Sequence, residues 1–263
     1  TGFEAMRALG AWERGAILRT TAAKITERRE ELAALLSAEA GKPIRDARAE
    51  IDRGALTFRL AAEEAERMIG ETIPLDLAPA SKGRLGITQR FPVGPVLGIS
   101  PFNFPLNLAA HKVAPAIAVG CSMVLKPPSA DPLIMLKVAE ILVDAGLPAG
   151  GLSVIPTSRP DADRLIEDER FKVLSFTGSP TVGWSLKGRA GKKRVILERQ
   201  LHRTPPRGRA ARCAAFPSPR RNARGSGRSS RAAPAAGCGW IGRRDRGRMV
   251  DPTPLLGPRA DNR

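Results

Sequence analysis

Short apolar runs alternate with longer helical stretches between residues 95 and 198 of the chain. Each run is about four residues long, contains β-branched side chains and is bounded by turn residues, which favours strands over short buried helices. The stretches between the runs are long enough to be crossover helices. The expected strands are 96–99, 122–125, 152–155, 173–176 and 194–197, and the expected helices are 106–119, 132–145, 161–168 and 181–189. This alternation predicts an α/β fold with a doubly wound parallel sheet of about five strands.

Two helices and a hairpin are predicted ahead of the sheet. Thr26 can cap the first helix, whose apolar residues recur at helical spacing until the Gly-Lys-Pro sequence at 41–43 ends it. The second runs from about Ile44 to Gly70, with an apolar face opposite a charged one, and both helices are expected to serve packing alone. Residues 71–93 contain Pro and Gly breaks and an alternating segment, which suggests an extended ribbon able to pair with another subunit.

Charge is distributed unevenly along the chain. The 263 residues include 43 Lys and Arg against 26 Asp and Glu, which gives a net charge of +17. Residues 1–198 carry only +4 of this, whereas residues 199–263 hold 16 Arg, no Lys and three acids. No apolar run is long enough for a membrane span, and no signal-peptide pattern opens the chain. Cys121, Cys213 and Cys238 form neither a disulfide framework nor a zinc motif, so we expect a cytoplasmic protein without a metal site.

Polar side chains follow several of the expected strands, at the edge where ligands bind in an open α/β sheet. Asn103 lies between two prolines that restrict the backbone, and its amide could donate to a developing oxyanion. Lys126, with Ser129 close beside it, could bind the ribose hydroxyls of a nucleotide. Each has a structural alternative: Asn103 as a turn residue that satisfies its own backbone, and Lys126 as a solvated surface lysine.

The last two strands are followed by groups suited to an anion and to proton transfer. Gly178 and Ser179 open a helix directly after a strand, so its free N–H groups, its dipole and the hydroxyl suit a pyrophosphate. Gly183 completes a GxxxxG spacing, which differs from the GxGxxG dinucleotide fingerprint. Glu198 ends the final strand where a general base would lie, and its alternative is an exposed strand-end charge.

Together, these segments resemble motifs of the aldehyde dehydrogenase superfamily, in the same order and at similar spacing. Phe102 stands where the family's first motif has Trp. The resemblance covers residues 1–198. The matching segments are SPFNFP at 100–105, KPPS at 126–129, FTGSPTVG at 176–183 and VILE at 195–198, which are similar to PWNFP, KPxE, FTGSxxxG and the start of LELGG.

The resemblance implies a Rossmann-like domain and NAD(P)-dependent oxidation of a small-molecule aldehyde to a carboxylic acid or acyl derivative. In the family a cysteine attacks the aldehyde; Asn103 would hold the oxyanion and Glu198 would activate water. Full-length members form homo-oligomers. The segment 101–107 is similar to members acting on small hydroxy-, phospho- or phosphono-aldehydes. The implied cofactor-binding residues are Ser100, Pro101, Phe102, Lys126, Ser129, Gly178, Ser179 and Gly183.

Ser129 departs from the family pattern in a way that affects the cofactor. It stands where the family often has a Glu that binds the ribose 2′-hydroxyl. Without that carboxylate, the repulsion against a 2′-phosphate is relieved. We therefore expect NAD or NADP as cofactor, with NADP tolerated.

After Glu198 the resemblance ends. The family continues with Leu-Gly-Gly-Asn and later places its nucleophilic cysteine in a GQxC-like context, but neither appears in residues 199–263. We interpret this Arg-, Pro-, Ala- and Gly-rich tail as a GC-rich gene read out of frame. The chain is then a cofactor-binding fragment, inactive for lack of the catalytic domain.

The alternative is a stand-alone nucleotide-binding module whose basic arm binds nucleic acid. Against it, the tail offers only Phe216 and Trp240 for base stacking and has no recognisable nucleic-acid-binding motif. Nucleic acid is therefore the less favoured partner.

Overall fold

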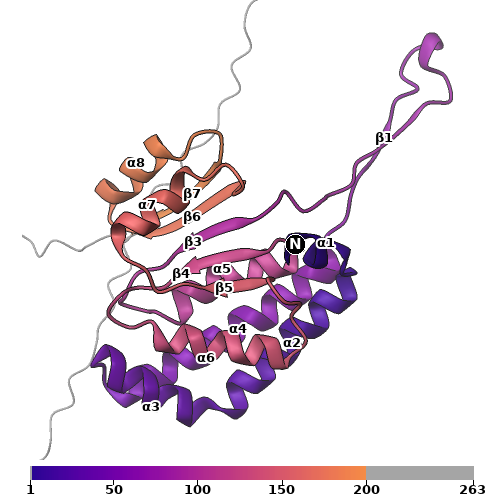
Figure 1. Cartoon of the computed structure of the whole chain (residues 1–263). Helices are drawn as coiled ribbons and strands as arrows, with labels where there is room; N and C mark the ends of the chain where they lie inside the picture. Colours follow the sequence, from indigo (N-terminus) through magenta and orange to yellow (C-terminus); the bar gives the residue numbers. More distant parts are fainter. Residues whose placement is uncertain (1, 200–263) are drawn as a thin grey trace, which may run out of the picture. The chain divides into compact units, whose positions relative to one another are not determined.

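The computed structural model of the chain describes residues 2–199 (Figure 1). The predictions for the tail from residue 200 onward, including Cys213 and Cys238, lie outside the described residues. The centre of the described part is a parallel sheet of five strands in the order β5-β4-β3-β6-β7. The strands are β3 (Val96–Ile99), β4 (Met123–Lys126), β5 (Leu152–Val154), β6 (Val173–Gly178) and β7 (Arg194–Arg199).

Helices cover both faces of the sheet, which confirms the doubly wound α/β fold (Figure 1). On one face lie α5 (Asn107–Ala118) and α6 (Leu133–Asp144), and on the other lie α7 (Arg159–Glu167) and α8 (Pro180–Arg189). The chain moves outward from β3 through β4 to β5, and then returns to place β6 on the other side of β3. The helix that follows β3 and the helix that follows β6 therefore lie on opposite faces of the sheet. The place where the strand order reverses between them is a topological switch point, and a ligand-binding crevice forms at such a point.

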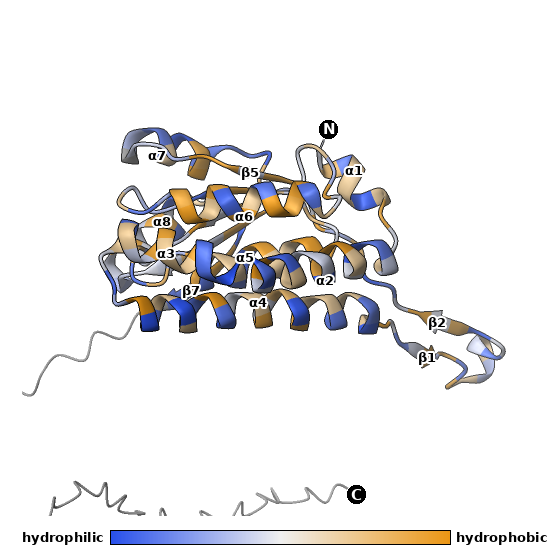
Figure 2. Ribbon diagram, turned by 90° about the horizontal axis from the view of Figure 1, so that it is seen from below, coloured by the Kyte–Doolittle hydropathy of each residue, from blue (hydrophilic) through white to orange (hydrophobic). Residues whose placement is uncertain are grey.

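Four helices precede the sheet: α1 (Gly2–Ala8), α2 (Ala11–Glu27), α3 (Arg29–Ala40) and α4 (Ile44–Arg67). The last three form a further layer over α5 and α6. Figure 2 shows α4 with hydrophilic residues along its outer side. The predicted stop at 41–43 is confirmed, because Gly41 ends α3 in the left-handed conformation with φ of 64°.

The predicted cap at Thr26 is wrong. Thr26 lies inside α2, where its Oγ1 donates to the carbonyl of Ala22 at 2.9 Å. A threonine hydroxyl can bond either a free N–H group at a helix start or a carbonyl one turn back, and here it makes the second bond. The second predicted helix also ends at Arg67, three residues before the expected Gly70.

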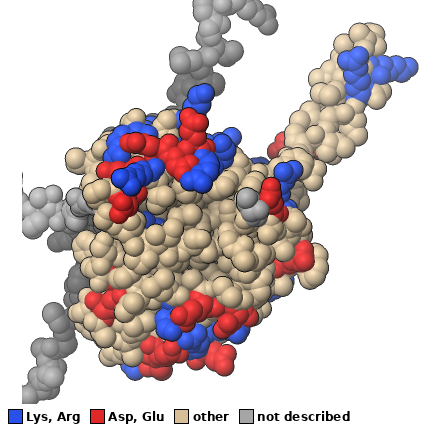
Figure 3. Space-filling view, in the orientation of Figure 1, with Lys and Arg blue, Asp and Glu red and all other residues tan. Residues whose placement is uncertain are grey.

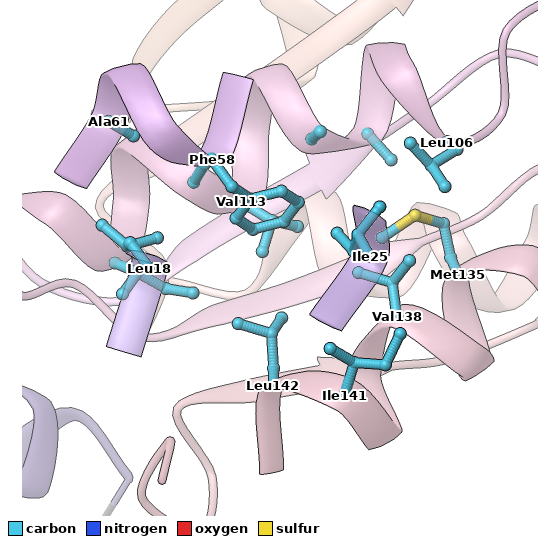
Figure 4. Packing of buried hydrophobic residues seen from close by; sticks show 14 of the residues in the cluster. Leu18, Ile25, Phe58, Ala61, Leu106, Val113, Met135, Val138, Ile141 and Leu142 are labelled. Atoms are coloured by element: carbon cyan, nitrogen blue, oxygen red, sulfur yellow. The ribbon is translucent and has the colours of Figure 1, made fainter. Parts of the chain in front are cut away.

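The main hydrophobic core lies between the N-terminal helices and the face of the sheet that carries α5 and α6. Leu18 from α2 and Phe58 from α4 are fully buried and lie beside Val113 of α5, with Leu142 of α6 nearby (Figure 4). Full burial of one such side chain stabilises the fold by about 1.5–3 kcal/mol. A second, smaller cluster around Leu174 fills the space under α7 and α8. The two cores fix the sheet from both sides and leave its carboxyl edge open to a ligand.

The predicted ribbon is present as a two-stranded arm. β1 (Thr72–Pro74) pairs antiparallel with β2 (Leu85–Ile87), and η1 (Pro79–Ser81) lies in the turn between them. The arm extends away from the sheet (Figure 1) and is largely uncharged except at its tip (Figure 3). Its apolar residues are exposed, with Leu77 at 84% and Ile87 at 75%.

Candidate functional site

The register of the sheet brings the predicted polar residues to one edge. Ile99 at the end of β3 is paired with Lys126 on one side and with Phe176 on the other. Thr177 at the end of β6 is paired with Glu198 of β7. Because carboxyl ends of parallel strands meet at the same edge, the segments after β3, β4, β6 and β7 surround a common space.

The larger cavity at this edge has a volume of about 500 Å³. Four predicted residues, Ser100, Pro101, Lys126 and Gly178, line it together with apolar side chains of α7 and α8 such as Ile166. The Ser100 hydroxyl is buried without a hydrogen-bond partner in the described part of the chain. The Lys126 ammonium donates to the carbonyl of Pro127 at 3.2 Å. Apolar walls with a few polar groups are typical of a pocket for a small molecule.

A second cavity of about 230 Å³ adjoins the first at the start of α8. Gly178, Ser179, Gly183 and Glu198 line it, so all four predicted residues of β6, α8 and β7 are brought together. The Ser179 hydroxyl caps α8 by accepting a weak hydrogen bond from Val182 N at 3.4 Å. Pro180 has no N–H group and the N–H of Gly183 donates to the Ser179 carbonyl, so the N–H of Thr181 and the helix dipole are what this helix start offers to an anion.

Gly178 is required here by the close approach of an aromatic ring. A Cβ atom added at Gly178 would lie 2.5 Å from Cζ of Phe176, which is closer than real carbon contacts allow. One at Gly183 would lie 3.4 Å from the same ring. Gly178 thus admits the Phe176 ring beneath the start of α8, whereas a Cβ atom at Gly183 would make only an ordinary contact with this ring.

The starts of α5 and α6, which follow β3 and β4 at the same edge of the sheet, are already occupied by the protein's own carboxylates. Glu50 accepts from the N–H groups of Leu106 and Asn107 at the start of α5, at 3.0 and 3.1 Å. Glu39 accepts from Leu133 and Ile134 at the start of α6, at 2.6 and 3.1 Å. At the start of α8, in contrast, the Ser179 hydroxyl is the cap, and no carboxylate of residues 2–199 accepts from the first N–H groups. Since a helix start favours negative charge, α8 is the start best suited to an external anion.

Glu198 belongs to a hydrogen-bonded group that includes a buried lysine. The Lys112 ammonium donates to Oγ1 of Thr177 at 2.6 Å and to Oγ of Ser175 at 3.2 Å. Thr177 in turn donates to Oε2 of Glu198 at 2.7 Å, and the Lys112 nitrogen lies 3.8 Å from the same oxygen. Burial lowers the pKa of Lys112 to about 8, although the Glu198 charge opposes this shift. A carboxylate oriented by a hydroxyl and a nearby ammonium can accept a proton from water.

Three predicted residues lie outside both cavities. Asn103 and Ser129 are exposed, and Phe102 has 66% of its surface exposed. None of the three lines either cavity. The structure therefore gathers Ser100, Pro101, Lys126, Gly178, Ser179, Gly183 and Glu198 in two adjoining cavities, and leaves the Asn103 segment at their margin.

Two residues of this region were missed by sequence reasoning. Lys112 lies within the apolar face of α5, next to Val113 and at helical spacing from Ala109 and Ala116. Glu50 lies within the apolar face of α4 in the same way, although α4 was expected to serve packing alone. A charged residue at a core position is the signal that would have found both, because such a residue is rarely buried without a specific partner.

The described residues fit a dinucleotide better than a metal. Within residues 2–199 no three His, Cys, Asp or Glu side chains are grouped to hold a metal ion. The start of α8, whose first turn lacks an acidic residue, suits a pyrophosphate, and the unpartnered Ser100 hydroxyl lies in an adjoining cavity with apolar walls. No helix in this part of the chain combines the length and hydropathy needed to cross a membrane.

Comparison with known proteins gives a consistent result. The aldehyde dehydrogenase family matches residues 1–200. A 3-sulfolactaldehyde dehydrogenase from Priestia aryabhattai is 43% identical over 188 residues, which are 71% of this chain and 39% of that protein. A lactaldehyde dehydrogenase from Methanocaldococcus jannaschii is 41% identical over 200 residues, 74% of this chain and 42% of that protein.

Solved structures agree with the sequence relatives. Aldehyde dehydrogenase 21 from Physcomitrella patens, in complex with the reaction product succinate, has 55% identity and a TM-score of 0.72, covering 74% of this chain and 41% of that one. Glyceraldehyde-3-phosphate dehydrogenase from Methanocaldococcus jannaschii, complexed with NADP, has 41% identity and a TM-score of 0.70, covering 74% and 43%. The chain spans about two fifths of the length of these relatives. With its motifs, its sheet topology and its relatives in agreement, the chain belongs to the aldehyde dehydrogenase family.

Proposed function

We propose that residues 1–198 bind NAD or NADP at the carboxyl edge of the sheet, as the cofactor-binding part of an aldehyde-oxidising enzyme. The observation that carries this proposal is the start of α8, which opens between two adjoining cavities lined by seven of the predicted residues. The adenosine half would lie against α7 and α8, with Lys126 and Ser129 near its ribose. The pyrophosphate would accept hydrogen bonds from the N–H of Thr181 at the start of α8 and from Ser179.

The cofactor, when bound, supplies the hydride acceptor for aldehyde oxidation. Glu198 would accept a proton from the water that releases the acyl group. Thr177 and Lys112 would orient this carboxylate, since they contact the same oxygen. Asn103 would donate to the oxyanion from the margin of the cavities.

We further propose that this chain does not itself oxidise aldehydes. Cys121 is the one cysteine among the described residues, and it is buried just before β4, at the amino edge of the sheet. Glu198 lies at the opposite, carboxyl edge. The nucleophile that the family's reaction needs is therefore not placed beside Glu198 by residues 2–199.

For the parent enzyme, a short aldehyde that carries an anionic group is the substrate class we favour. The relatives named above include enzymes for sulfolactaldehyde and glyceraldehyde 3-phosphate. Next to Asn103, the Arg53 guanidinium lies 5.1 Å from the centre of the Phe104 ring. Arg53 is exposed, and its Nε donates to the backbone carbonyl of Ala49 at 3.3 Å rather than to a carboxylate, so its positive charge is available to an anion.

A cofactor titration with a charge placed in the first turn of α8 tests the proposal. Thr181→Glu adds a carboxylate where the pyrophosphate would lie, and Thr20→Glu, on the exposed side of α2, is the matched control. We expect NADPH, followed by its fluorescence, to bind the wild type and the control alike and to bind Thr181→Glu about ten-fold or more weakly. Unchanged binding by Thr181→Glu, or no binding of NADPH or NADH by the wild type, would refute the proposed site.

For the tail, we propose an out-of-frame reading after the Glu198 codon. The support is compositional: residues 199–263 hold 16 Arg and no Lys, and the family match ends at residue 200. The nucleotide sequence downstream of that codon, translated in three frames, tests this. Another frame that resumes Leu-Gly-Gly-Asn, and later a Gly-Gln-x-Cys segment, is the expected result. Its absence would favour a genuine basic arm.

We also propose that the β1–β2 arm pairs with a second subunit. Its exposed apolar side chains, among them Leu77 and Ile87, cost free energy when left in water. Replacing both with Asp should shift the chain to a smaller species in sedimentation velocity. A monomeric wild type would contradict this role.

A further inference from the structure

A buried ion pair lies where α4 meets the start of α5. Glu50 is 0% exposed, and its Oε2 accepts from the Lys42 ammonium at 2.5 Å. Its other oxygen, Oε1, accepts from the backbone N–H groups of Leu106 and Asn107. Both carboxylate oxygens are therefore engaged, which a buried charge requires.

The same ion pair reaches the segment that carries Asn103. The Lys42 nitrogen also donates to the backbone carbonyl of Asn103 at 3.0 Å, and it lies 5.0 Å from the centre of the Phe104 ring. The segment from Ser100 to Leu106 is thus held at two points by one pair of side chains. The first point is the backbone carbonyl of Asn103, whose side-chain amide is the candidate oxyanion donor, and the second is the start of the following helix.

The pair has little freedom to move. The Lys42 carbonyl accepts from the Ser37 hydroxyl at 2.7 Å, which fixes the turn between α3 and α4. One helical turn after Glu50, a Cβ atom at Gly54 would lie 2.0 Å from Cδ2 of Leu106. This close packing fixes the distance between α4 and α5, and with it the distance from Glu50 to the N–H groups that it binds.

We propose that Glu50 and Lys42 are positioning residues that set the orientation of Asn103. The catalytic role of Asn103 in this inference rests on the proposed function, whereas the contacts that position Asn103 belong to this chain alone. Lys42 holds the Asn103 carbonyl and Glu50 holds Lys42, so the backbone at Asn103 is fixed before any ligand binds. Such preorganisation is what an oxyanion donor needs.

The main alternative is that Glu50 only caps α5. Glu39 provides a matched control because its carboxylate caps a different helix, α6, through two N–H groups in the same way. Glu50→Gln keeps an acceptor oxygen for the start of α5 but presents an NH₂ group to Lys42. Lys42→Met leaves Glu50 in place as a cap and removes the contacts of the ammonium with the Asn103 carbonyl, with Glu50 and with the Phe104 ring.

The experiment measures the side-chain amide signals of Asn103 by NMR, together with amide hydrogen exchange at Leu106 and Asn107, in the full chain. We expect Glu50→Gln and Lys42→Met both to shift the Asn103 signals, and Glu39→Gln to leave them in place. Because Glu50→Gln keeps the acceptor oxygen, exchange at Leu106 and Asn107 should change little in this variant. Lys42→Arg, which keeps a donor cation, should restore the wild-type Asn103 signals more fully than Lys42→Met.

Unchanged Asn103 signals in Lys42→Met would overturn the proposal and leave Glu50 as a helix cap. If Glu50→Gln does not fold, the comparison of Lys42→Met with Lys42→Arg still decides the question. A wild type that fails to bind NADPH would refute the proposed function, while the Asn103 signals would still report the positioning role.

Discussion

Replacing Lys112 with methionine removes a buried ammonium whose cost to folding depends on pH. The Lys112 side chain is 1% exposed, and its pKa falls from the ordinary value of 10.5 to about 8, chiefly through burial and against the attraction of Glu198. The gap of about 2.5 between these pKa values corresponds to about 3 kcal/mol. Below about pH 8 the folded state bears this full cost, because Lys112 is protonated both folded and unfolded.

The cost disappears as the pH rises. Between about pH 8 and pH 10.5 the unfolded chain binds a proton that the folded chain does not, so the free energy of unfolding increases with pH. The increase from Lys112 is up to about 1.4 kcal/mol per pH unit. The methionine side chain of the variant has no proton to bind, and the loss of the bonds to Thr177 and Ser175 adds an offset that changes little with pH.

Urea unfolding of wild type and Lys112→Met from about pH 7 to about pH 10 measures this difference. Subtracting the variant's free energy of unfolding from that of the wild type at each pH cancels the contribution of the other lysines. We expect the difference to grow by about 2–3 kcal/mol in favour of the wild type across the range. Parallel curves would refute the reasoning, because they would mean that Lys112 titrates alike in the folded and unfolded chain.

Three other substitutions test single positions. Gly54→Ala should lower the free energy of unfolding by about 1–3 kcal/mol, because its Cβ atom would overlap Leu106. Gly188→Ala is the control: its Cβ atom would meet open space, so urea unfolding should show no such loss. Asp131 is 2% exposed, and burial raises its pKa to about 6. The wild type therefore loses stability as the pH rises from about 4 to about 6, because the folded chain holds a proton that the unfolded chain has released. Asp131→Asn does not titrate and should gain stability relative to the wild type over this range, as measured by thermal unfolding. Ser129→Glu should weaken NADP binding and spare NAD, which paired titrations would test; equal losses for both cofactors would contradict the 2′-phosphate argument.

The sheet was largely predictable because strand and helix residues repeat with different periods. The expected strand at 96–99 matches β3, and the expected helix at 106–119 contains α5. β6 extends two residues beyond the expected 173–176 because Thr177 and Gly178 pair with β7, and pairing partners cannot be read from a local pattern. The error at Thr26 has the same origin, since the hydroxyl suits a cap or a helix interior equally well.

The site was predictable in its ligand-facing residues but not in the groups that hold them. Gly178, Ser179 and Glu198 follow apolar runs, so their position at the sheet edge follows from the topology. Lys112 and Glu50 come from helices, and their partners are distant in sequence: Lys112 bonds Thr177, and Glu50 bonds Leu106. Only the packing of helix on sheet brings these pairs together.

A crystal structure of the chain grown with NADP tests the central claim most directly, because it locates the cofactor relative to α8. We expect a pyrophosphate at the start of α8, within hydrogen-bond distance of Ser179, and an adenosine in the cavity lined by Ser100 and Lys126. A cofactor bound elsewhere on residues 2–199, or density for none at saturating NADP, would contradict it.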